Sequence, residues 1–170
     1  MIKAAVIGLG WWGQTVLRLL SNSSTIRPVL CVDPLESARA AASAFGVETS
    51  PHFDDALAHP DVRAVILCTP QECHADQIAA AARSGRHVFC EKPLCTTSAD
   101  AELAIAAVRK AGVQLGIGHE RRFEPAVIQM RQRFAAGEFG HPLLLERFSV
   151  DVNRNSKGVP RGAQIRFELL

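Results

Sequence analysis

A glycine turn near the N-terminus is the first feature of this sequence that could do chemistry. It consists of Gly8, Leu9, Gly10, Trp11, Trp12 and Gly13 and directly follows the apolar run Ile2–Ile7. At this spacing Gly8 permits a tight bend, Gly10 lets a pyrophosphate approach the backbone, and Gly13 lets a helix pack closely on the strand. The N–H groups and positive end of that helix would face the phosphates. The turn therefore predicts a dinucleotide site.

An acidic residue follows this turn at the distance that a dinucleotide site requires. Asp33 comes twenty residues after Gly13, at the end of a second apolar run. Its carboxylate would accept hydrogen bonds from the adenosine ribose hydroxyls and would repel a 2′-phosphate. No Arg or Lys follows it before Arg39, which favours NAD over NADP. The alternative is a glycine turn without a ligand, in which Asp33 only caps the helix that starts at Pro34.

The two adjacent tryptophans of the turn leave two interpretations open. In the first, one ring of Trp11 and Trp12 packs on the sheet edge while the other is half-exposed. In the second, one indole shields the nicotinamide or the substrate side of the site. The sequence does not decide between them.

A second polar segment closes the apolar run Ala64–Cys68. It contains Thr69 and Pro70, with His74 four residues after the proline. Ligands of open α/β sheets bind at the carboxyl ends of parallel strands, which is where this segment falls. We expect Thr69 and Pro70 to contact the cofactor, and His74 either to contact it or to begin the following helix. Cys68, Cys73 and His74 lack a second ligand pair at zinc spacing, so no metal site is expected.

A third polar segment, Glu91-Lys92-Pro93, closes the run His87–Cys90. It also stands at the carboxyl end of a predicted parallel strand. Lys92 is the residue that we expect to take part in chemistry, since an ammonium can stabilise a developing alkoxide. The alternatives are that Lys92 is an exposed lysine before a turn proline and that Glu91 is a surface carboxylate.

The segments between these motifs must position them. Short apolar runs alternate with Ala-rich helical stretches, which predicts parallel strands joined by right-handed crossovers. The expected fold is an α/β doubly wound parallel sheet, a Rossmann domain that binds NAD(P) over residues 1–120. The predicted strands are Ile2–Ile7, Val29–Val32, Val47–Thr49, Ala64–Cys68, His87–Cys90 and Gln114–Ile117. The predicted helices are Gln14–Leu20, Leu35–Phe45, Asp54–Ala58, Glu72–Ser84 and one from Thr97 or Ser98 to Lys110.

The pattern changes after Gly118. Pro125–Ala136 has helical spacing, and the alternating stretch Leu143–Val152 predicts one strand of a different, antiparallel sheet. From Asn153 onward the chain is polar and rich in turn residues. Residues 121–170 are thus expected to be a crossover helix and the first strand of an α+β domain. A single strand would leave an unpaired edge, so it must fold back, pair with a partner such as a second copy of the chain, or remain loose.

Composition narrows the partners. The net charge is +2, and the basic residues are scattered singly except at Arg121-Arg122, so neither nucleic acid nor a membrane surface is expected to bind. No apolar run has the roughly 20 residues that span a bilayer. The five cysteines include no Cys-x-x-Cys pair, which favours a reducing, cytoplasmic location.

Together the three motifs resemble those of the Gfo/Idh/MocA family (glucose–fructose oxidoreductase, inositol dehydrogenase and MocA). That family has a Rossmann glycine turn, a Thr-Pro segment with a His four residues after the Pro, and a Gly-(Lys/Arg)-His-Val…Glu-Lys-Pro block. This sequence matches all three in order. Gly118–Pro125 also resembles the family's Arg-Phe-x-Pro segment, so the resemblance covers about residues 2 to 150. One small departure is Gln71, where family members often have Asn.

The resemblance implies an NAD(P)-dependent oxidoreductase that transfers hydride between nicotinamide and a sugar, cyclitol or related polyol. It places Lys92 near the nicotinamide and the substrate hydroxyl as the catalytic residue, and Glu91 at the nicotinamide ribose or in ordering the loop. The expected cofactor-binding residues are Gly8, Leu9, Gly10, Trp11, Trp12, Gly13, Asp33, Thr69, Pro70, His74, Glu91 and Lys92.

Family members are much longer, and their second, α+β domain supplies the substrate pocket. The segment after Val152 does not resemble their usual continuation, which suggests a truncation or a frame shift. We therefore expect the chain alone to bind cofactor without catalysing a reaction, and a non-catalytic dinucleotide-binding module or inert truncated homologue is the competing hypothesis. A short-chain reductase is excluded because its Tyr-x-x-x-Lys pair needs a tyrosine and the chain has none.

Overall fold

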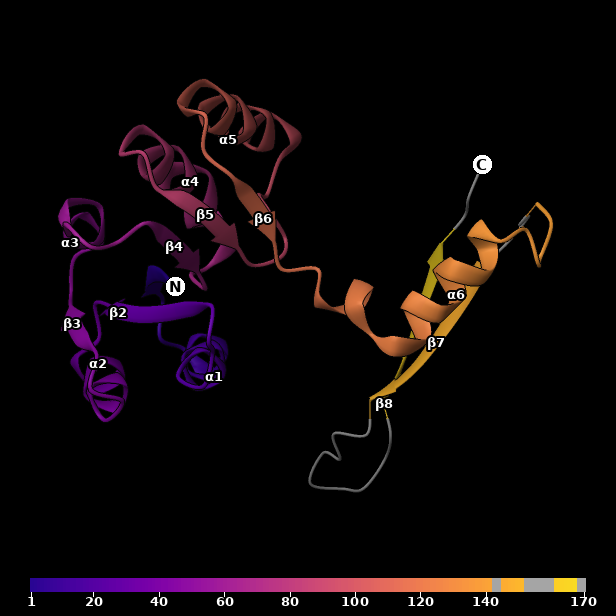
Figure 1. The fold of residues 1–170 in the computed structure, drawn as a ribbon, viewed down its shortest axis with the longest axis horizontal. Helices are drawn as coiled ribbons and strands as arrows, with labels where there is room; N and C mark the ends of the chain where they lie inside the picture. Colours follow the sequence, from indigo (N-terminus) through magenta and orange to yellow (C-terminus); the bar gives the residue numbers. More distant parts are fainter. Residues whose placement is uncertain (142–144, 152–160, 168–170) are drawn as a thin grey trace. The chain divides into compact units, whose positions relative to one another are not determined.

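The chain divides into two compact units, residues 1–119 and 120–170 (Figure 1). The computed structural model describes the backbone of residues 1–141, 145–151 and 161–167, and the side chains of residues 1–141. None of the helices in these described segments is long and apolar enough to cross a bilayer.

The first unit is built on a six-stranded sheet in which every pair of neighbouring strands is parallel. The strand order is β3-β2-β1-β4-β5-β6, which reverses direction between β1 and β4. This confirms the predicted doubly wound α/β fold, and it places the topological switch point where β1 and β4 end. The strands are β1 (Ile2–Ile7), β2 (Ile26–Val32), β3 (Glu48–Ser50), β4 (Ala64–Leu67), β5 (His87–Cys90) and β6 (Leu115–Ile117).

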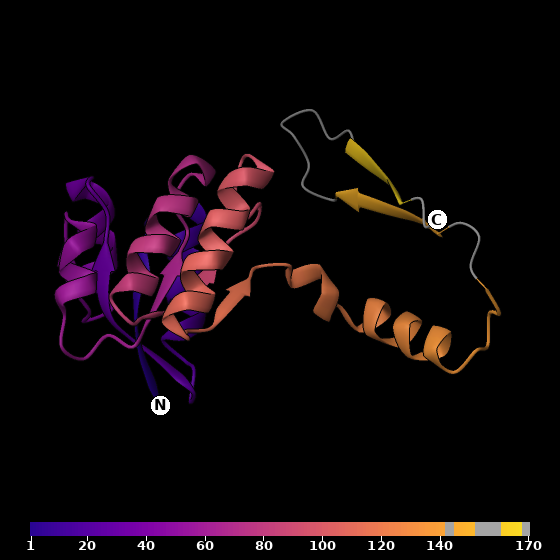
Figure 2. The ribbon, with the colours of Figure 1, turned by 90° about the horizontal axis from the view of Figure 1, so that it is seen from above.

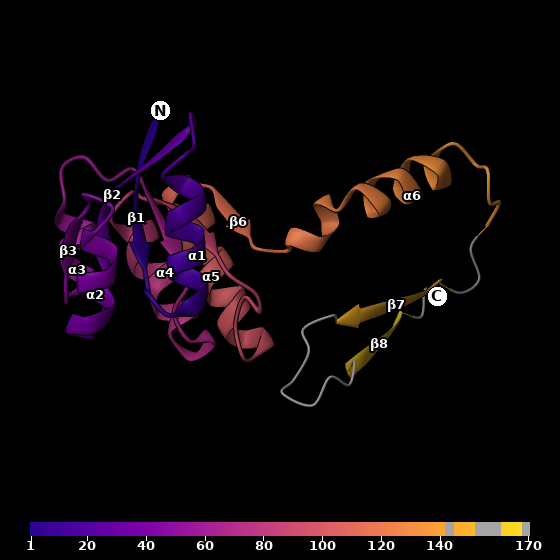
Figure 3. The ribbon, with the colours of Figure 1, turned by 90° about the horizontal axis from the view of Figure 1, so that it is seen from below.

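Helices cover the two faces of this sheet. Figure 1 shows α1 and α2 on one side of the strands and α4 and α5 on the other, with α4 and α5 side by side (Figure 2). Seen from the opposite direction, α1 runs alongside β1 (Figure 3). The helices are α1 (Trp11–Leu20), α2 (Glu36–Ser43), α3 (Phe53–Ala58), α4 (His74–Arg83) and α5 (Ser98–Ala111), with a 3₁₀ turn η1 (Gln71–Cys73) before α4.

Alternate residues of β1 supply the two halves of the core. Ala5 and Ile7 belong to the cluster that packs with α3, α4 and α5, whereas Ala4 and Val6 belong to the cluster that packs with α1 and α2. Successive side chains of a strand point to opposite faces, so a strand covered on both sides is apolar throughout. All four side chains are fully buried or nearly so. This is why the sequence shows a continuous apolar run rather than an alternating one.

Two elements begin three residues earlier than the sequence predicts, and the other boundaries of this unit differ by at most two residues. Helix α1 begins at Trp11 rather than Gln14, because the glycine turn leads directly into the helix. Strand β2 begins at Ile26 rather than Val29, and its register with β1 shifts between Ala4 and Ala5. The shift follows Pro28, which has no N–H to donate to a ladder.

The second unit contains the 3₁₀ turn η2 (Glu120–Phe123), helix α6 (Pro125–Ala135) and an antiparallel pair, β7 (Leu145–Asp151) and β8 (Arg161–Phe167). The prediction of a single strand followed by a turn-rich tail was therefore wrong for residues 161–167. The chain folds back so that β8 pairs with β7, which is the first of the three predicted alternatives. The sequence of β8 alternates, with Ala163, Ile165 and Phe167 apolar and Gln164 and Arg166 polar, and this alternation is the signal that could have identified the strand. The ends of the predicted strand, at 143–144 and 152, lie outside the described residues.

An arginine just before β5 holds the connection between α3 and β4. The Arg86 guanidinium donates hydrogen bonds to the carbonyl oxygens of Leu57 at 2.9 Å, His59 at 3.2 Å and Val62 at 2.6 Å. The Arg86 side chain thus supplies donors to three backbone carbonyls at the end of α3 and in the loop that follows it. The connection is fixed relative to the sheet without regular structure.

We predict that Arg86→Met lowers the free energy of unfolding by about 2–3 kcal/mol, because charged donors are lost from partly buried carbonyls. Urea denaturation followed by circular dichroism measures the change. Arg83→Met is the matched control, since Arg83 is exposed at the end of α4 and should change stability by about 0.5 kcal/mol or less. Equal stabilities of the two variants would contradict the bracing role of Arg86.

Candidate functional site

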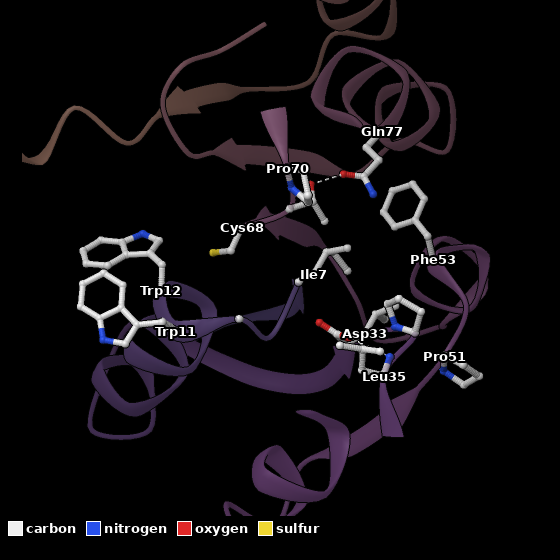
Figure 4. Close-up of a pocket in the computed structure, with 15 residues that line it drawn as sticks. Ile7, Trp11, Trp12, Asp33, Leu35, Pro51, Phe53, Cys68, Pro70 and Gln77 are labelled. Atoms are coloured by element: carbon white, nitrogen blue, oxygen red, sulfur yellow. Dashed lines mark hydrogen bonds between the residues drawn. The ribbon is translucent and has the colours of Figure 1, made fainter. Parts of the chain in front are cut away.

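A cavity of about 650 Å³ opens at the carboxyl ends of β1, β2 and β4. The start of α1 forms one wall, and side chains from the β3–α3 connection and α4 form the opposite wall (Figure 4). The cavity therefore lies at the topological switch point of the sheet, where ligands of open α/β sheets bind. Three of the predicted motifs contribute to its lining, namely the glycine turn, Asp33 and the Thr69-Pro70 segment.

Each glycine of the turn has its own structural requirement. Gly8 has a φ of 86°, and a Cβ there would lie 2.8 Å from the backbone carbonyl of Cys68. A Cβ on Gly13 would collide with the carbonyl oxygen of Gly8. Gly10 is different, because a Cβ there would meet no atom within 4 Å and would point into open space beside the cavity. The first and last glycines thus build the turn, whereas Gly10 leaves room for something outside the protein.

The Asp33 carboxylate joins the end of β2 to the glycine turn. One oxygen, Oδ2, accepts a hydrogen bond from the Leu9 N–H at 2.7 Å, and the other, Oδ1, accepts one from the Leu35 N–H at 2.9 Å. Only 8% of the residue is exposed, and it lines the cavity. Helix α2 begins at Glu36 with Leu35 as its N-cap, so Asp33 does not cap that helix directly. The carboxylate holds the turn and also borders the cavity.

A cation contacts the backbone of Asp33. Arg39, on α2, donates from Nη1 to the carbonyl oxygens of Asp33 at 2.7 Å and Pro34 at 2.8 Å. Because one turn of helix α2 folds back over the end of β2, six residues of sequence separation become direct contact. Arg39, the first cation after Asp33 in the sequence, thus has its guanidinium against the end of β2.

Glutamine 77 is a cavity residue that the sequence reasoning missed. The Thr69 hydroxyl donates to its Oε1 at 2.6 Å, and both residues line the cavity (Figure 4). Gln77 comes one turn after His74 on the same face of α4, and that spacing is the signal that could have identified it. Gln71, the amide that the sequence suggested, is exposed in η1.

His74 has a different setting from the one expected of a ligand contact. It begins α4, as one of the two sequence interpretations predicted. The residue is 1% exposed, and its ring nitrogens lie 2.9 Å and 3.0 Å from the carbonyl oxygens of Pro93 and Thr69. Since backbone groups occupy both nitrogens, the structure gives no support to a direct cofactor contact from this ring.

Glu91 and Lys92 lie at the end of β5. Glu91 is 9% exposed, its Oε2 accepts the Lys92 N–H at 3.3 Å, and a Cβ on Gly118 would come within 2.7 Å of its carboxylate. The Glu91 carboxylate is therefore packed against the end of β6, while the Lys92 residue is exposed. Neither is among the residues that line the cavity described above. The structure favours the loop-ordering role for Glu91 over the surface carboxylate.

The two tryptophans share the rim of the cavity. Trp11 is 79% exposed, whereas Trp12 is partly buried with its Nε1 shielded from solvent and not hydrogen-bonded within the described residues. Their ring centroids are 5.5 Å apart, with the planes tilted by 40°. Both rings line the cavity, so either indole is placed where it could shield a bound nicotinamide or substrate.

Cys68 is a thiol on the cavity wall that cannot serve as a nucleophile. Burial, and then the charge of Glu91, raise the pKa of its thiol to about 12. Since the thiolate is the reactive form, Cys68 stays protonated and inert near neutral pH. Within the part of the chain whose side chains are described, no three His, Cys, Asp or Glu residues group so as to hold a metal ion.

Comparison with known proteins bears on this site. The family described as "Oxidoreductase family, NAD-binding Rossmann fold" (GFO_IDH_MocA) matches residues 2–119. The chain is 34% identical over 149 residues to inositol 2-dehydrogenase of Salmonella typhimurium, covering 85% of this chain and 44% of that protein. It is 35% identical over 153 residues to scyllo-inositol 2-dehydrogenase (NAD(+)) of Bacillus subtilis, covering 88% and 45%.

A solved structure of an inositol dehydrogenase also matches this chain. Scyllo-inositol dehydrogenase from Lactobacillus casei, with bound NAD(H) and scyllo-inositol, matches with a TM-score of 0.82 at 26% identity. The match covers 87% of this chain and 44% of that one. The chain spans less than half the length of these relatives. The family match over residues 2–119 contains the cavity and the three motifs.

We predict that Gly10→Val abolishes NAD binding while the fold survives. The backbone at Gly10 (φ −62°, ψ −173°) accepts any residue, so the stability cost is about 1 kcal/mol or less, but the side chain fills the open space beside the cavity. Isothermal titration with NAD and thermal melting measure the two effects. Gly13→Ala is the contrasting variant and should lower the melting temperature, since its Cβ strikes a backbone carbonyl. A folded Gly10→Val protein with unchanged NAD affinity would show that phosphate does not bind at this turn.

Proposed function

The chain belongs to the Gfo/Idh/MocA family of NAD-binding oxidoreductases, and we propose that it serves NAD-dependent hydride transfer to or from a polyol. The observation that carries the proposal is the Asp33 carboxylate, which holds the glycine turn at the mouth of the 650 Å³ cavity. The substrate class, a cyclitol or related sugar, is supported by the relatives that act on inositol by name.

The cavity fits a dinucleotide in shape and chemistry. The open space at Gly10 and the N-terminus of α1 would take the pyrophosphate, because the first N–H groups of a helix have no partner within it. Asp33 would accept the hydroxyls of the adenosine ribose. Thr69, Pro70 and the neighbouring amide of Gln77 would border the dinucleotide on the β4 side.

Lys92 would act on the substrate. When NAD is bound, its nicotinamide ring accepts hydride from the carbon of the alcohol. The Lys92 ammonium, at the end of β5, would hydrogen-bond the alcohol oxygen and stabilise the negative charge that develops on it, while the hydroxyl proton would pass to a base outside the described residues. Glu91 would keep the Lys92 backbone in place through the bond from its N–H.

The remaining expectations about partners stay proposals. We expect no nucleic acid or membrane partner, because the net charge of +2 is not gathered into a basic stripe. We also propose a cytoplasmic location and a homo-oligomeric state.

We predict that NAD binds at least tenfold more tightly than NADP and that Asp33→Asn narrows this gap. The substitution removes the charge that repels a 2′-phosphate but leaves one oxygen to accept a backbone N–H. It also exposes the phosphate to Arg39, whose guanidinium lies against the Asp33 carbonyl. Paired isothermal titrations with the two cofactors measure the ratio.

Two variants control this test. Asp76→Asn makes the same change of net charge at an exposed position of α4 and should leave the ratio unchanged. Adding Arg39→Met to Asp33→Asn should remove the gain in NADP affinity. Equal affinity of the unmodified chain for both cofactors would contradict the assignment of NAD.

We predict that a polypeptide of residues 1–170 binds NAD but shows no dehydrogenase turnover. Positioning a substrate carbon against the nicotinamide supplies as much as ~7–11 kcal/mol of the barrier. A single acid–base group gives only about 10²–10⁴-fold. The assay follows NADH absorbance with saturating NAD and inositol or glucose, with Lys92→Ala as the blank and Lys110→Ala as control. Failure to bind NAD would overturn the proposed function, and saturable turnover above the blank would show that these residues already build a substrate pocket.

A further inference from the structure

A buried histidine connects the loop after β4 to the loop after β5. His74 Nε2 lies 3.0 Å from the carbonyl oxygen of Thr69, and Nδ1 lies 2.9 Å from the carbonyl oxygen of Pro93. Carbonyl oxygens only accept, so a ring nitrogen bonds to one only where it carries a proton; the tautomer with its proton on Nδ1 donates to Pro93. With 1% of the residue exposed, water does not compete for these groups. The ring is thus a bridge between the carboxyl ends of two adjacent strands.

Each end of this bridge leads to a different part of the proposed site. On the β4 side, Thr69 lines the cavity and its hydroxyl donates to Gln77 at 2.6 Å. On the β5 side, Pro93 directly follows Lys92, whose N–H donates to the buried carboxylate of Glu91. The backbone of Lys92 is therefore anchored on one side by Glu91 and on the other by His74.

Burial of His74 raises the free-energy cost of breaking its hydrogen bonds. A buried carbonyl that loses its donor costs about 1–3 kcal/mol, because no water replaces the lost bond. The place of the Lys92 backbone limits where its ammonium can reach, because the four-carbon side chain has a fixed length. Of the two anchors, only His74 also reaches the cavity wall.

We propose that His74 is a positioning residue, which holds the backbone of Lys92 at a fixed place relative to a dinucleotide that lies along Thr69. The inference rests on the proposed function, since it assumes that NAD occupies the cavity and that Lys92 faces the nicotinamide. It assigns the histidine no contact with the cofactor.

Two conservative substitutions separate the two bonds of the ring. The amide nitrogen of an asparagine is two bonds from Cβ, like Nδ1, whereas that of a glutamine is three bonds away, like Nε2. His74→Asn thus places an amide donor where Nδ1 faces Pro93 and none where Nε2 faces Thr69. His74→Gln places its amide donor where Nε2 faces Thr69 and none where Nδ1 faces Pro93. His87→Gln is the matched control, since His87 is an exposed residue of β5 whose Nδ1 accepts the Gln114 N–H.

The position of Lys92 can be followed without turnover. The chain has four lysines, so reductive methylation with ¹³C-formaldehyde gives a simple spectrum and leaves their charge in place. Loss of one signal in Lys92→Arg assigns Lys92. Each variant is then titrated with NAD and with ADP-ribose, which lacks the nicotinamide.

In the unmodified chain, NAD should shift the Lys92 signal and ADP-ribose should not. His74→Asn should keep that shift at saturation while weakening both ligands by the same factor, about two- to tenfold. His74→Gln should lose the shift and keep its affinity for ADP-ribose. His87→Gln should behave as the unmodified chain.

A shift that survives in His74→Gln, or that is lost equally in both His74 variants, would overturn the positioning role. Binding of NAD without a Lys92 shift in the unmodified chain would overturn it as well. If the variants do not fold, the bond to Pro93 is still tested in the unmodified chain, where ¹⁵N-histidine spectra should show a slowly exchanging proton on Nδ1 of His74; its absence would overturn the proposal. Failure of the unmodified chain to bind NAD would count against the proposed function instead.

Discussion

The hydrogen bond from the Leu9 N–H to the Asp33 carboxylate, at 2.7 Å, is the interaction on which the rest of the site depends. It joins the ends of β1 and β2, and it stabilises a nearly buried charge with a backbone donor. With the turn held in this way, Gly8 can follow its left-handed path against β4 and α1 can begin at Trp11, beside the cavity. A charge that is held by two backbone N–H groups needs no salt bridge, so it remains available to the ribose.

The part of the site that follows from local chain geometry could be predicted from the sequence. The turn glycines, Asp33 and the order of the parallel strands all follow from spacing and apolar runs, because each depends on residues close in sequence or on strand alternation. The contact of Arg39 with the Asp33 backbone and the place of Gln77 in the cavity were not predicted, because both depend on how a helix packs on a strand end. Strand β8 was missed although Ala163, Ile165 and Phe167 alternate with polar residues, because the surrounding turn residues outweighed this short pattern.

The carboxyl ends of β4 and β5 have different roles in the proposed site: the first borders the cofactor cavity and the second carries Lys92. The end of β4 carries Cys68, which burial keeps protonated, and Thr69, which faces the cavity. The end of β5 carries Lys92, whose backbone is held by Glu91 and, through Pro93, by His74. Buried polar groups with satisfied hydrogen bonds thus fix two loops that have no regular structure, and the exposed lysine gains a defined place from them.

The central claim is that a dinucleotide binds with its phosphates against the glycine turn and its ribose against Asp33. Backbone amide NMR of the ¹⁵N-labelled chain during titration with NAD tests it most directly. The account predicts that the largest shifts fall on the amides of Gly10, Trp11, Trp12 and Leu35, and that ADP-ribose reproduces them. Saturable shifts confined to another part of the chain, or no shifts at millimolar NAD, would contradict it.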